Sequence, residues 1–543
     1  MKIVIVGGGS AGWMTAATLI KSFPHKEICL IESSEIPTVG VGESTLGSIR
    51  QWCRWVGIDS QRESFLKATN ASLKLSIKFT DFYKKDSGSF YYPFGRPAFY
   101  DTRNAFYDWS VKKYYYPDTP VEDFTRCLFS ATSLFENNKY STNTSGVFDN
   151  FNPEDDVAYH FDAAKFGEWL KINFCLPKGV TCIKAKVLEI PTDDSGIKHL
   201  VLDSGELITA DLFVDCTGFE SILLAGALKE PFISYSNMLP NNNAWATRIP
   251  YKDKEKELEG FTNCTAIENG WCWNIPLWSR LGTGYVFSDK FVDPETAKKE
   301  FKKYLMSNKM VVPRTKEEVD SYTYKLIKMR VGIHERTWVK NVVAIGLSAG
   351  FIEPLESNGL FSVHEFLWKL LDVLYLEDIN QFNKDMYNET VHDEFNDFSK
   401  FVALHYALSK RNDTSYWRDI ANKEFRDPVT NEPNSNNKLR IATFHSLIWR
   451  YMINWEHPMN LAGITHIAVG QNLNMLNARR VAELEYRERV NLLNQTKPII
   501  DLWEKKKRAW EEAADRSPTL YQYLNDNFYK ENDSFNEEII TIN

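Results

Sequence analysis

A glycine turn near the start of the chain has the residue types and spacing of a dinucleotide site. Gly7, Gly9 and Gly12 follow an apolar run at residues 2–6, and Glu32 stands about 20 residues beyond the last of them. The first glycine suits a tight turn, the second lets backbone approach a pyrophosphate, and the third lets a helix pack on a strand. The helix start can receive the phosphates, and Glu32 can accept a hydrogen bond from a ribose hydroxyl. We therefore expect dinucleotide binding.

A second pattern suggests different chemistry. Residues 346–350, Gly-Leu-Ser-Ala-Gly, match the G-x-S-x-G nucleophile elbow and follow an apolar run. Partner histidines are available downstream at His405, His445, His457 and His466. However, Pro354 falls where the helix of the elbow should run, and a nucleotide turn at residue 7 is unusual in such hydrolases. A serine hydrolase acting through Ser348 is kept as an alternative that these features disfavour.

The end of another strand-like run indicates which dinucleotide, FAD or NAD, the chain binds. Residues 210–218 read Ala-Asp-Leu-Phe-Val-Asp-Cys-Thr-Gly, a buried strand with a polar end. This string resembles the second signature of FAD-dependent oxidoreductases, in which the strand returns under the flavin. Together with the glycine turn, it favours FAD.

Three short strings extend the comparison. They are Gly-Trp-Cys-Trp-Asn-Ile-Pro at 270–276, Phe-Ile-Glu-Pro-Leu-Glu-Ser-Asn-Gly at 351–359 and Ser-Ile-Lys-Phe at 76–79. In these strings the chain resembles the flavin-dependent halogenases, typified by tryptophan halogenases, over about residues 1–420. Their W-x-W-x-I-P string is met by Trp271, Trp273, Ile275 and Pro276, and it is the most specific element because ordinary flavin hydroxylases do not typically carry it.

The resemblance implies a two-component enzyme. Reduced FAD, supplied by a separate reductase, would use oxygen and a halide (chloride, bromide or iodide) to make hypohalous acid. The oxidant would travel inside the protein to a lysine beside an electron-rich aromatic substrate. Trp271 and Trp273 would form the barrier that keeps substrate from the flavin. An FAD-dependent aromatic monooxygenase is the second hypothesis, and a flavin-binding protein without catalysis is a third.

The same resemblance assigns roles to single residues. Lys78 is expected to polarise hypohalous acid or take up the halogen as a neutral amine, which needs a pKa lowered by burial. Glu356 would stabilise the cationic arenium intermediate and take its proton. Backbone N–H groups at Asn358 and Gly359 could hold the halide, which needs donors without a competing carboxylate. The expected cofactor contacts are Gly7, Gly9, Ser10, Ala11, Gly12, Glu32, Gly42, Glu43, Ser44, Val187, Leu347 and Leu360.

The substrate pocket departs from tryptophan-specific members. Those carry Tyr-His-Pro-Phe, whereas residues 91–94 here read Tyr-Tyr-Pro-Phe, so Tyr92 replaces the histidine that stacks on indole. Phe94 matches, but the segment that grips the ammonium and carboxylate of tryptophan has no counterpart. We therefore expect Tyr92, Phe94 and Ser357 to contact an indole or phenol rather than free tryptophan.

The elements that must position these residues predict an α/β protein. A β-turn-α-β unit opens the chain, hairpins are expected over residues 180–215, and helical patterns recur from residue 365 onward. The expected architecture is a Rossmann-like FAD-binding domain of the flavin monooxygenase type at 1–365, interwoven with a mainly helical substrate-binding domain at 366–543. An aromatic-rich insertion on the substrate side is expected near residues 86–154.

Composition limits the remaining classes. The net charge of −8 disfavours nucleic-acid binding, and no apolar run is long enough to span a membrane. The eight cysteines form no C-x-x-C pair, so neither a metal site nor a disulfide framework is expected, and buried thiols suit the cytoplasm. Aromatic residues make up 14% of the chain, enough to line a pocket for a flat ligand as well as a core. The resemblance also implies a homo-oligomer.

Overall fold

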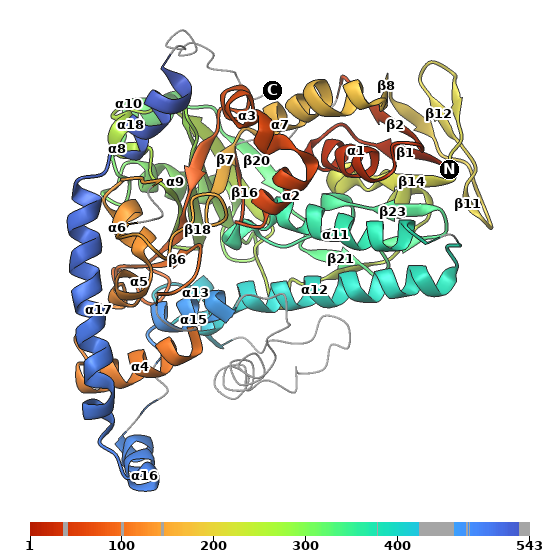
Figure 1. Ribbon diagram of the computed structural model, residues 1–543. Helices are drawn as coiled ribbons and strands as arrows, with labels where there is room; N and C mark the ends of the chain where they lie inside the picture. Colours follow the sequence, from red (N-terminus) through yellow and green to blue (C-terminus); the bar gives the residue numbers. More distant parts are fainter. Residues whose placement is uncertain are drawn as a thin grey trace.

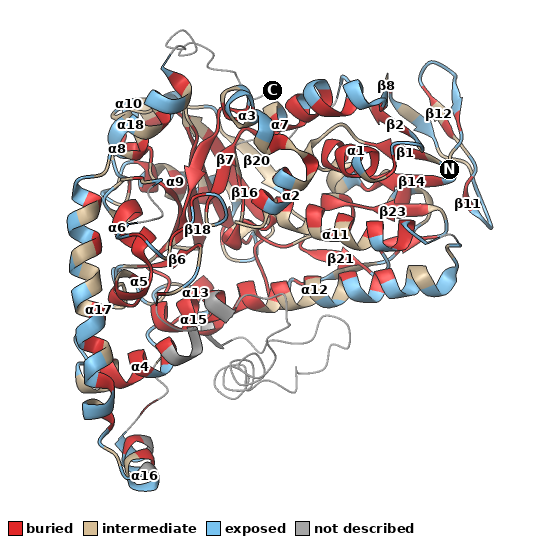
Figure 2. Cartoon of the chain, in the orientation of Figure 1, coloured by how far each residue is buried: buried red, intermediate tan, exposed pale blue. Residues whose placement is uncertain are grey.

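The computed structural model describes residues 1–35, 42–98, 102–142, 146–376, 378–422, 461–473, 476 and 478–530. Two large sheets dominate it, one on each side of the view in Figure 1, with long helices along two margins. Most residues of both sheets are buried (Figure 2).

The glycine turn belongs to a six-stranded sheet of order β22-β23-β14-β1-β2-β8. Its strands are β22 (Trp338–Val339), β23 (Val342–Ala344), β14 (Leu212–Asp215), β1 (Lys2–Val6), β2 (Glu27–Glu32) and β8 (Thr181–Lys184). All neighbours are parallel except β22 and β23. Helices α1 (Ser10–Ser22), α7 (Ala163–Leu170) and α11 (Gly359–Leu374) pack together beside it. The predicted Rossmann-like unit is therefore present.

The second sheet has seven strands in the order β20-β16-β19-β18-β17-β5-β6. They are β20 (Lys325–Lys328), β16 (Asn243–Ile249), β19 (Leu281–Phe287), β18 (Gly270–Pro276), β17 (Phe261–Ile267), β5 (Ser76–Thr80) and β6 (Ser89–Pro93). Only β17 and β5 run parallel. Every residue of β17, β18 and β19 is buried, as expected of strands covered on both faces.

Short strands form four smaller sheets. The sheet β3-β7-β4 consists of β3 (Glu43–Ser44), β7 (Ala158–Phe161) and β4 (Ser72–Lys74). The others are β9 (Val187–Glu189), β10 (Thr192–Asp193), β11 (Gly196–Ile197), β12 (Leu200–Leu202), β13 (Leu207–Ile208), β15 (Phe232–Ser234), β21 (Gly332–His334) and β24 (Gly350–Phe351). The hairpins predicted over 180–215 are the small sheets β10-β11 and β13-β12-β9.

The described residues of the back third of the chain are mainly helical, as predicted. It contains α12 (Gln381–Ala407), α13 (Ser415–Asn422), α15 (Leu461–Gly470), α16 (Ala478–Glu488), α17 (Leu492–Asp515) and α18 (Leu520–Leu524). Earlier helices are α2 (Ile49–Val56), α3 (Arg62–Thr69), α4 (Thr102–Tyr115), α5 (Asp123–Leu128), α6 (Ser130–Glu136), α8 (Lys254–Glu257), α9 (Pro294–Leu305) and α10 (Lys316–Ser321). None of the described helices is both long and apolar enough to cross a membrane.

The segment predicted as an aromatic-rich insertion has defined structure. Its first part, β6, is the edge strand of the seven-stranded sheet, and α4, α5 and α6 follow it. The helix α17 packs along all three of these helices (Figure 1). The predicted domain boundary at 365 falls inside α11, so the division into 1–365 and 366–543 stays a prediction.

Candidate active site

The glycine turn between β1 and α1 forms a tight cradle. Gly7 has φ +115°, and a Cβ there would lie 2.2 Å from the carbonyl oxygen of Cys216. A Cβ on Gly12 would lie 1.9 Å from the carbonyl oxygen of Gly7, so only glycine lets the helix start here. A Cβ on Gly9 would meet nothing within 4 Å, so there is room above the turn. The turn therefore fits the pyrophosphate of FAD at the start of α1.

Glu32 lies over this turn. Its Oε2 would be 2.3 Å from a Cβ built on Gly8, so the carboxylate reaches across from the end of β2. Its Oε1 accepts a hydrogen bond of 2.7 Å from Nζ of Lys171, a residue that the sequence pattern did not single out. This ion pair holds the carboxylate where a ribose hydroxyl could donate to it.

The other expected cofactor residues lie around the same unit. Ser10 donates to the carbonyl of Ala163, and Ala11 packs within 2.9 Å of a Cβ built on Gly346, beside Leu347. Val187 begins β9, directly after the strand β8 that pairs with Glu32. Gly42 faces the side chains of Leu277 and Ile275 at the end of β18. Glu43 and Ser44 lie on β3, described below, and Leu360 is a buried residue in the first turn of α11.

The end of β14 has a structural role in this chain. The carboxylate of Asp215 is buried, and Thr217, Leu223 and Leu224 donate backbone hydrogen bonds to it at 2.8–3.0 Å. It therefore caps the helical turn Ile222–Ala227 that follows.

The two predicted barrier tryptophans lie on one face of β18. Trp271 and Trp273 alternate with Cys272 and Asn274, and their ring centroids are 6.2 Å apart. Both rings are buried. Gly284, the register partner of Trp273 on β19, makes room for its ring, because a Cβ there would lie 2.2 Å from the indole. The strand therefore builds a wall of two indoles.

A buried carboxylate anchors this wall. Nε1 of Trp271 donates to Oε2 of Glu353 at 3.1 Å, and the hydroxyl of Tyr406 and the amide of Asn241 donate to the same oxygen at 2.8 and 2.7 Å. Burial raises the pKa of Glu353, and these donors oppose the rise. Glu353 directly precedes the turn Pro354–Glu356, so the wall and the catalytic loop are held together.

A buried lysine lies beside Glu356, and it is Lys74. Its side chain is buried, and Nζ donates to Oγ of Ser357 and to the carbonyl of Thr45, both at 2.8 Å. The network continues from Ser357 to Ser44 at 3.0 Å and from Ser44 to Thr262 at 2.6 Å. The structure thus brings β3, β4, β17 and the Glu356 loop together around one amine.

The electrostatics suit a reactive amine. Burial lowers the pKa of Lys74 to about 7, although the nearby groups Cys264, Glu356 and Glu43 favour its charged form. An amine with this pKa is substantially neutral near pH 7, whereas an exposed lysine is not. Lys74 therefore has the property that a halogen-carrying lysine requires.

Lys78 does not reach this network. It lies on β5 between Ile77 and Phe79, and Phe79 faces the site, with its ring centroid 4.7 Å from that of His405. Because neighbouring side chains on a strand point to opposite faces, Lys78 points away. Its Nζ lies 5.8 Å from the ring of Tyr91, its partner on β6.

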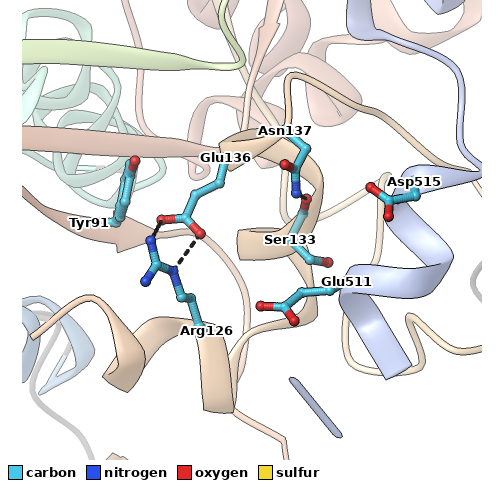
Figure 3. Close-up of a pocket in the computed structure, with 7 residues that line it drawn as sticks. All are labelled: Tyr91, Arg126, Ser133, Glu136, Asn137, Glu511 and Asp515. Atoms are coloured by element: carbon cyan, nitrogen blue, oxygen red, sulfur yellow. Dashed lines mark hydrogen bonds and ion pairs between the residues drawn. The ribbon is translucent and has the colours of Figure 1, made fainter. Parts of the chain in front are cut away.

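The surroundings of Lys78 form a separate polar region. Tyr91 lines a cavity of about 450 Å³ together with Arg126, Ser133, Glu136, Asn137, Glu511 and Asp515 (Figure 3). There Arg126 donates two hydrogen bonds, of 2.8 and 3.1 Å, to Glu136. The lysine beside the Glu356 loop is therefore Lys74, four residues earlier in the chain, whereas Lys78 lies near Tyr91; which lysine carries the halogen stays a prediction.

The expected halide turn begins α11. Asn358 occupies the N-cap position without a capping hydrogen bond, and its Oδ1 is buried without a hydrogen-bond partner among the described residues. However, Oε1 of Glu43 would be 2.8 Å from a Cβ built on Gly359. Burial raises the pKa of Glu43 to about 7, opposed by Lys74. A titratable carboxyl group thus faces the turn, although the predicted halide site required donors without a competing carboxylate.

Two of the expected substrate residues, Phe94 and Tyr92, lie near the amine of Lys74. Its Nζ lies 5.2 Å from the ring of Phe94, and the centroids of Phe94 and Tyr92 are 6.2 Å apart. His466 on α15 stacks on Tyr92, with centroids 5.4 Å apart and an interplanar angle of 21°. His466 is therefore a further residue of the aromatic surface that Tyr92 and Phe94 form. No local pattern could place it here, because its helix is distant along the chain.

The geometry does not support a nucleophilic Ser348. Its side chain is fully buried, and its Oγ has no hydrogen-bond partner among the described residues. Of the candidate histidines, His405 contacts Glu356 and His466 stacks on Tyr92, whereas His445 and His457 lie outside the described residues. Among the described residues, Ser348 therefore lacks the base that a serine nucleophile requires.

The described part of the chain is thus a flavin-type cradle joined to a buried Lys–Glu site by a tryptophan wall. The sequence profile described as "Tryptophan halogenase" matches residues 2–471. The chain belongs to the tryptophan halogenase family. Tryptophan 6-halogenase SttH of Streptomyces toxytricini is 35% identical over 449 residues, covering 79% of this chain and 82% of SttH. Tryptophan 7-halogenase RebH of Lentzea aerocolonigenes is 32% identical, covering 78% and 79%.

Solved structures agree with this assignment. The apo structure of VirX1 superimposes with a TM-score of 0.86 at 36% identity, covering 97% of this chain and 99% of VirX1. As a tryptophan halogenase family member, the chain is an enzyme that halogenates an aromatic substrate, with FAD as cofactor and halide as co-substrate. Family membership therefore rules out the serine hydrolase and the non-catalytic flavin-binding protein.

Proposed function

We propose that this chain is a two-component halogenase in which Lys74 and Glu356 act on an electron-rich arene of the indole or phenol type. The observation that carries the proposal is the buried Lys74, whose Nζ donates to Ser357 in the loop that follows Glu356. FAD, reduced by a separate reductase, supplies hypohalous acid from oxygen and halide when it is bound. The chain's own residues do the rest.

Each group has a defined task. Gly7–Gly12 and Glu32 bind the cofactor, and Trp271 and Trp273 separate it from the arene. The neutral amine of Lys74 takes up the halogen or donates to the oxidant beside the ring. Glu356 faces the positive charge that develops on the ring and accepts the proton that leaves. Asn358 and Gly359 hold the halide through the start of α11.

The aromatic surface around Tyr92 supports a substrate other than free tryptophan. Tyr92 lies against His466 and has Phe401 at its edge, with centroids 6.5 Å apart. This aromatic surface offers flat apolar contacts around Lys74, and Phe94 adds another ring. An indole or phenol without a charged backbone suits such a surface better than a free amino acid.

The test is product mass spectrometry with a flavin reductase, an arene panel and chloride, bromide or iodide. We expect halide-dependent products with indoles or phenols and little product from free tryptophan. Hydroxylated products that form without halide would instead establish an FAD-dependent aromatic monooxygenase.

A further inference from the structure

Glu356 has a partner that no role in the proposed reaction explains. Nε2 of His405, on α12, lies 2.8 Å from Oε1 of Glu356, and both side chains are fully buried. This is an ion-pair distance: among the described residues, neither Nε2 nor either oxygen of this carboxylate makes an aligned hydrogen bond with any group, including each other. The carboxylate is therefore removed from water with one close polar neighbour.

The other nitrogen of the imidazole fixes the protonation of this pair. Nδ1 of His405 lies 3.1 Å from the carbonyl oxygen of Val402. A carbonyl only accepts hydrogen bonds, so Nδ1 carries a hydrogen. If His405 were neutral, Nε2 would present a lone pair to an ionised carboxylate at 2.8 Å, which is repulsive. A proton on Nε2 removes this repulsion and gives the ion pair that the 2.8 Å distance fits.

Burial decides what this proton does. An isolated carboxylate without water strongly favours its neutral acid form. An imidazolium in contact with the carboxylate offsets that cost, because the pair is neutral as a whole. Phe79, Phe82 and Phe401 surround the imidazole at centroid distances of 4.7, 6.1 and 6.0 Å, so the interaction is weakly screened.

We propose that His405 is a positioning residue for the last step of halogenation: as an imidazolium it keeps Glu356 ionised, and hence able to accept the ring proton. The inference rests on the proposed function. In this step the C–H bond at the halogenated carbon breaks, and its electron pair restores the aromatic ring. The proton moves to Glu356, and no oxidant or reductant is needed.

Other charged groups also face Glu356 and must be considered in the test. Lys74 on β4 and Cys264 on β17 interact with it electrostatically, and Glu353 on the same loop interacts with His405. Glu43 on β3 lies beside Lys74. None of these four groups contacts the carboxylate of Glu356 at ion-pair distance; among the described residues, His405 alone does.

The experiment compares wild type with His405→Gln, which replaces the imidazolium with a neutral side chain. The holoenzyme is supplied with a flavin reductase and bromide, and with indole or ring-deuterated indole, over a range of pH. We expect the variant to be ~10- to 100-fold slower at neutral pH, the scale of an impaired general base. It should show a primary deuterium isotope effect that wild type lacks, and both effects should diminish as the pH rises.

The control is His334→Gln, another buried histidine, which lies on β21. It should keep the wild-type pH profile and show no isotope effect. A folded His405→Gln that binds FAD but shows neither an isotope effect nor a shifted pH profile would overturn the inference, even if it were slower. His405→Asn gives the same test should His405→Gln not fold. If wild type itself makes no brominated product, the proposed function fails instead.

Discussion

At the scale of single residues, Lys74 is the group on which the proposed chemistry depends. Its amine is held by Ser357 and Thr45 and is fully buried. Lys74→Arg should lower halogenation ~100-fold or more, because a guanidinium stays protonated and cannot take up a halogen as a neutral amine. Lys78→Arg is the matched control and should retain activity. Product mass spectrometry together with FAD binding provides the measurement.

Wild-type rates in Lys74→Arg, or loss of halogenation in Lys78→Arg only, would return the role to Lys78. The sequence could not distinguish these lysines, because both are flanked by apolar residues in one run. The difference is which face of which strand each occupies. Lys74 ends β4 in the small sheet, whereas Lys78 lies in β5 of the large one.

Glu43 introduces a pH dependence at the expected halide turn. Its pKa is raised to about 7, so the group passes from neutral to anionic as the pH rises through that value. An anion beside Gly359 repels halide, and we therefore expect the KM for bromide to rise with pH above about 7. Glu43→Gln should remove most of this dependence. Steady-state kinetics at several pH values tests this, and an unchanged slope in the variant would contradict it.

At the scale of elements, β18 and β19 together position the barrier. Trp273 lies against Gly284, where a Cβ would be 2.2 Å from the indole. Gly284→Ala should cost ~1–3 kcal/mol of stability, because the ring has to shift in a packed interior. It should also lower the fraction of reduced flavin that ends in halogenated product.

Denaturant unfolding and the ratio of product to flavin consumed measure these effects. Gly226→Ala is the control, since a Cβ there would make only ordinary contacts of 3.7 and 3.8 Å. A Gly284→Ala protein with wild-type stability and coupling would show that the wall does not depend on this close approach.

Local sequence patterns predicted several helices and strands, but they did not predict the side-chain contacts between elements that are distant in the chain. The run at residues 2–6 and the glycines after it predict β1 and α1, because strand and turn chemistry are local in sequence. Glu356 and its loop were also identified. By contrast, the contacts of Glu353 with Trp271 and of Glu356 with His405 join elements far apart in the chain. No periodicity encodes such pairings.

At the scale of the whole molecule, α17 from the C-terminal third of the chain forms ion pairs with α4 and α5 from its first quarter. Glu504 pairs with Lys112 of α4, and Lys507 pairs with Asp123 of α5, both at 2.8 Å. These ion pairs join α17 to α4 and α5, and the predicted interweaving of two modules stays a prediction. The expected homo-oligomer stays a prediction.

A tyrosine near the end of the described chain supports the strand that carries Lys74. The hydroxyl of Tyr529 lies within hydrogen-bond distance of the carbonyls of Leu66 and Ala71, at 2.7 and 2.8 Å, and Ala71 directly precedes β4. Tyr529→Phe should cost ~1 kcal/mol or more, because buried carbonyls lose their donor. Thermal unfolding measures this loss.

Tyr521→Phe serves as the control, because the ring of Tyr521 stacks on Trp278 with centroids 5.6 Å apart. It should be close to neutral. If the two variants were equally stable, the hydroxyl of Tyr529 would contribute nothing to holding this strand.

The position of Tyr529 also has a consequence for how the protein is made. Its hydroxyl and the Ala71 carbonyl are separated by 458 residues in the chain. At ~5–20 residues per second, a ribosome needs ~20–90 seconds to cover that distance. Throughout that interval the strand bearing Lys74 is already synthesised but lacks its final support. The contact that supports this strand can therefore form only after residue 529 has been translated, however early the flavin cradle folds.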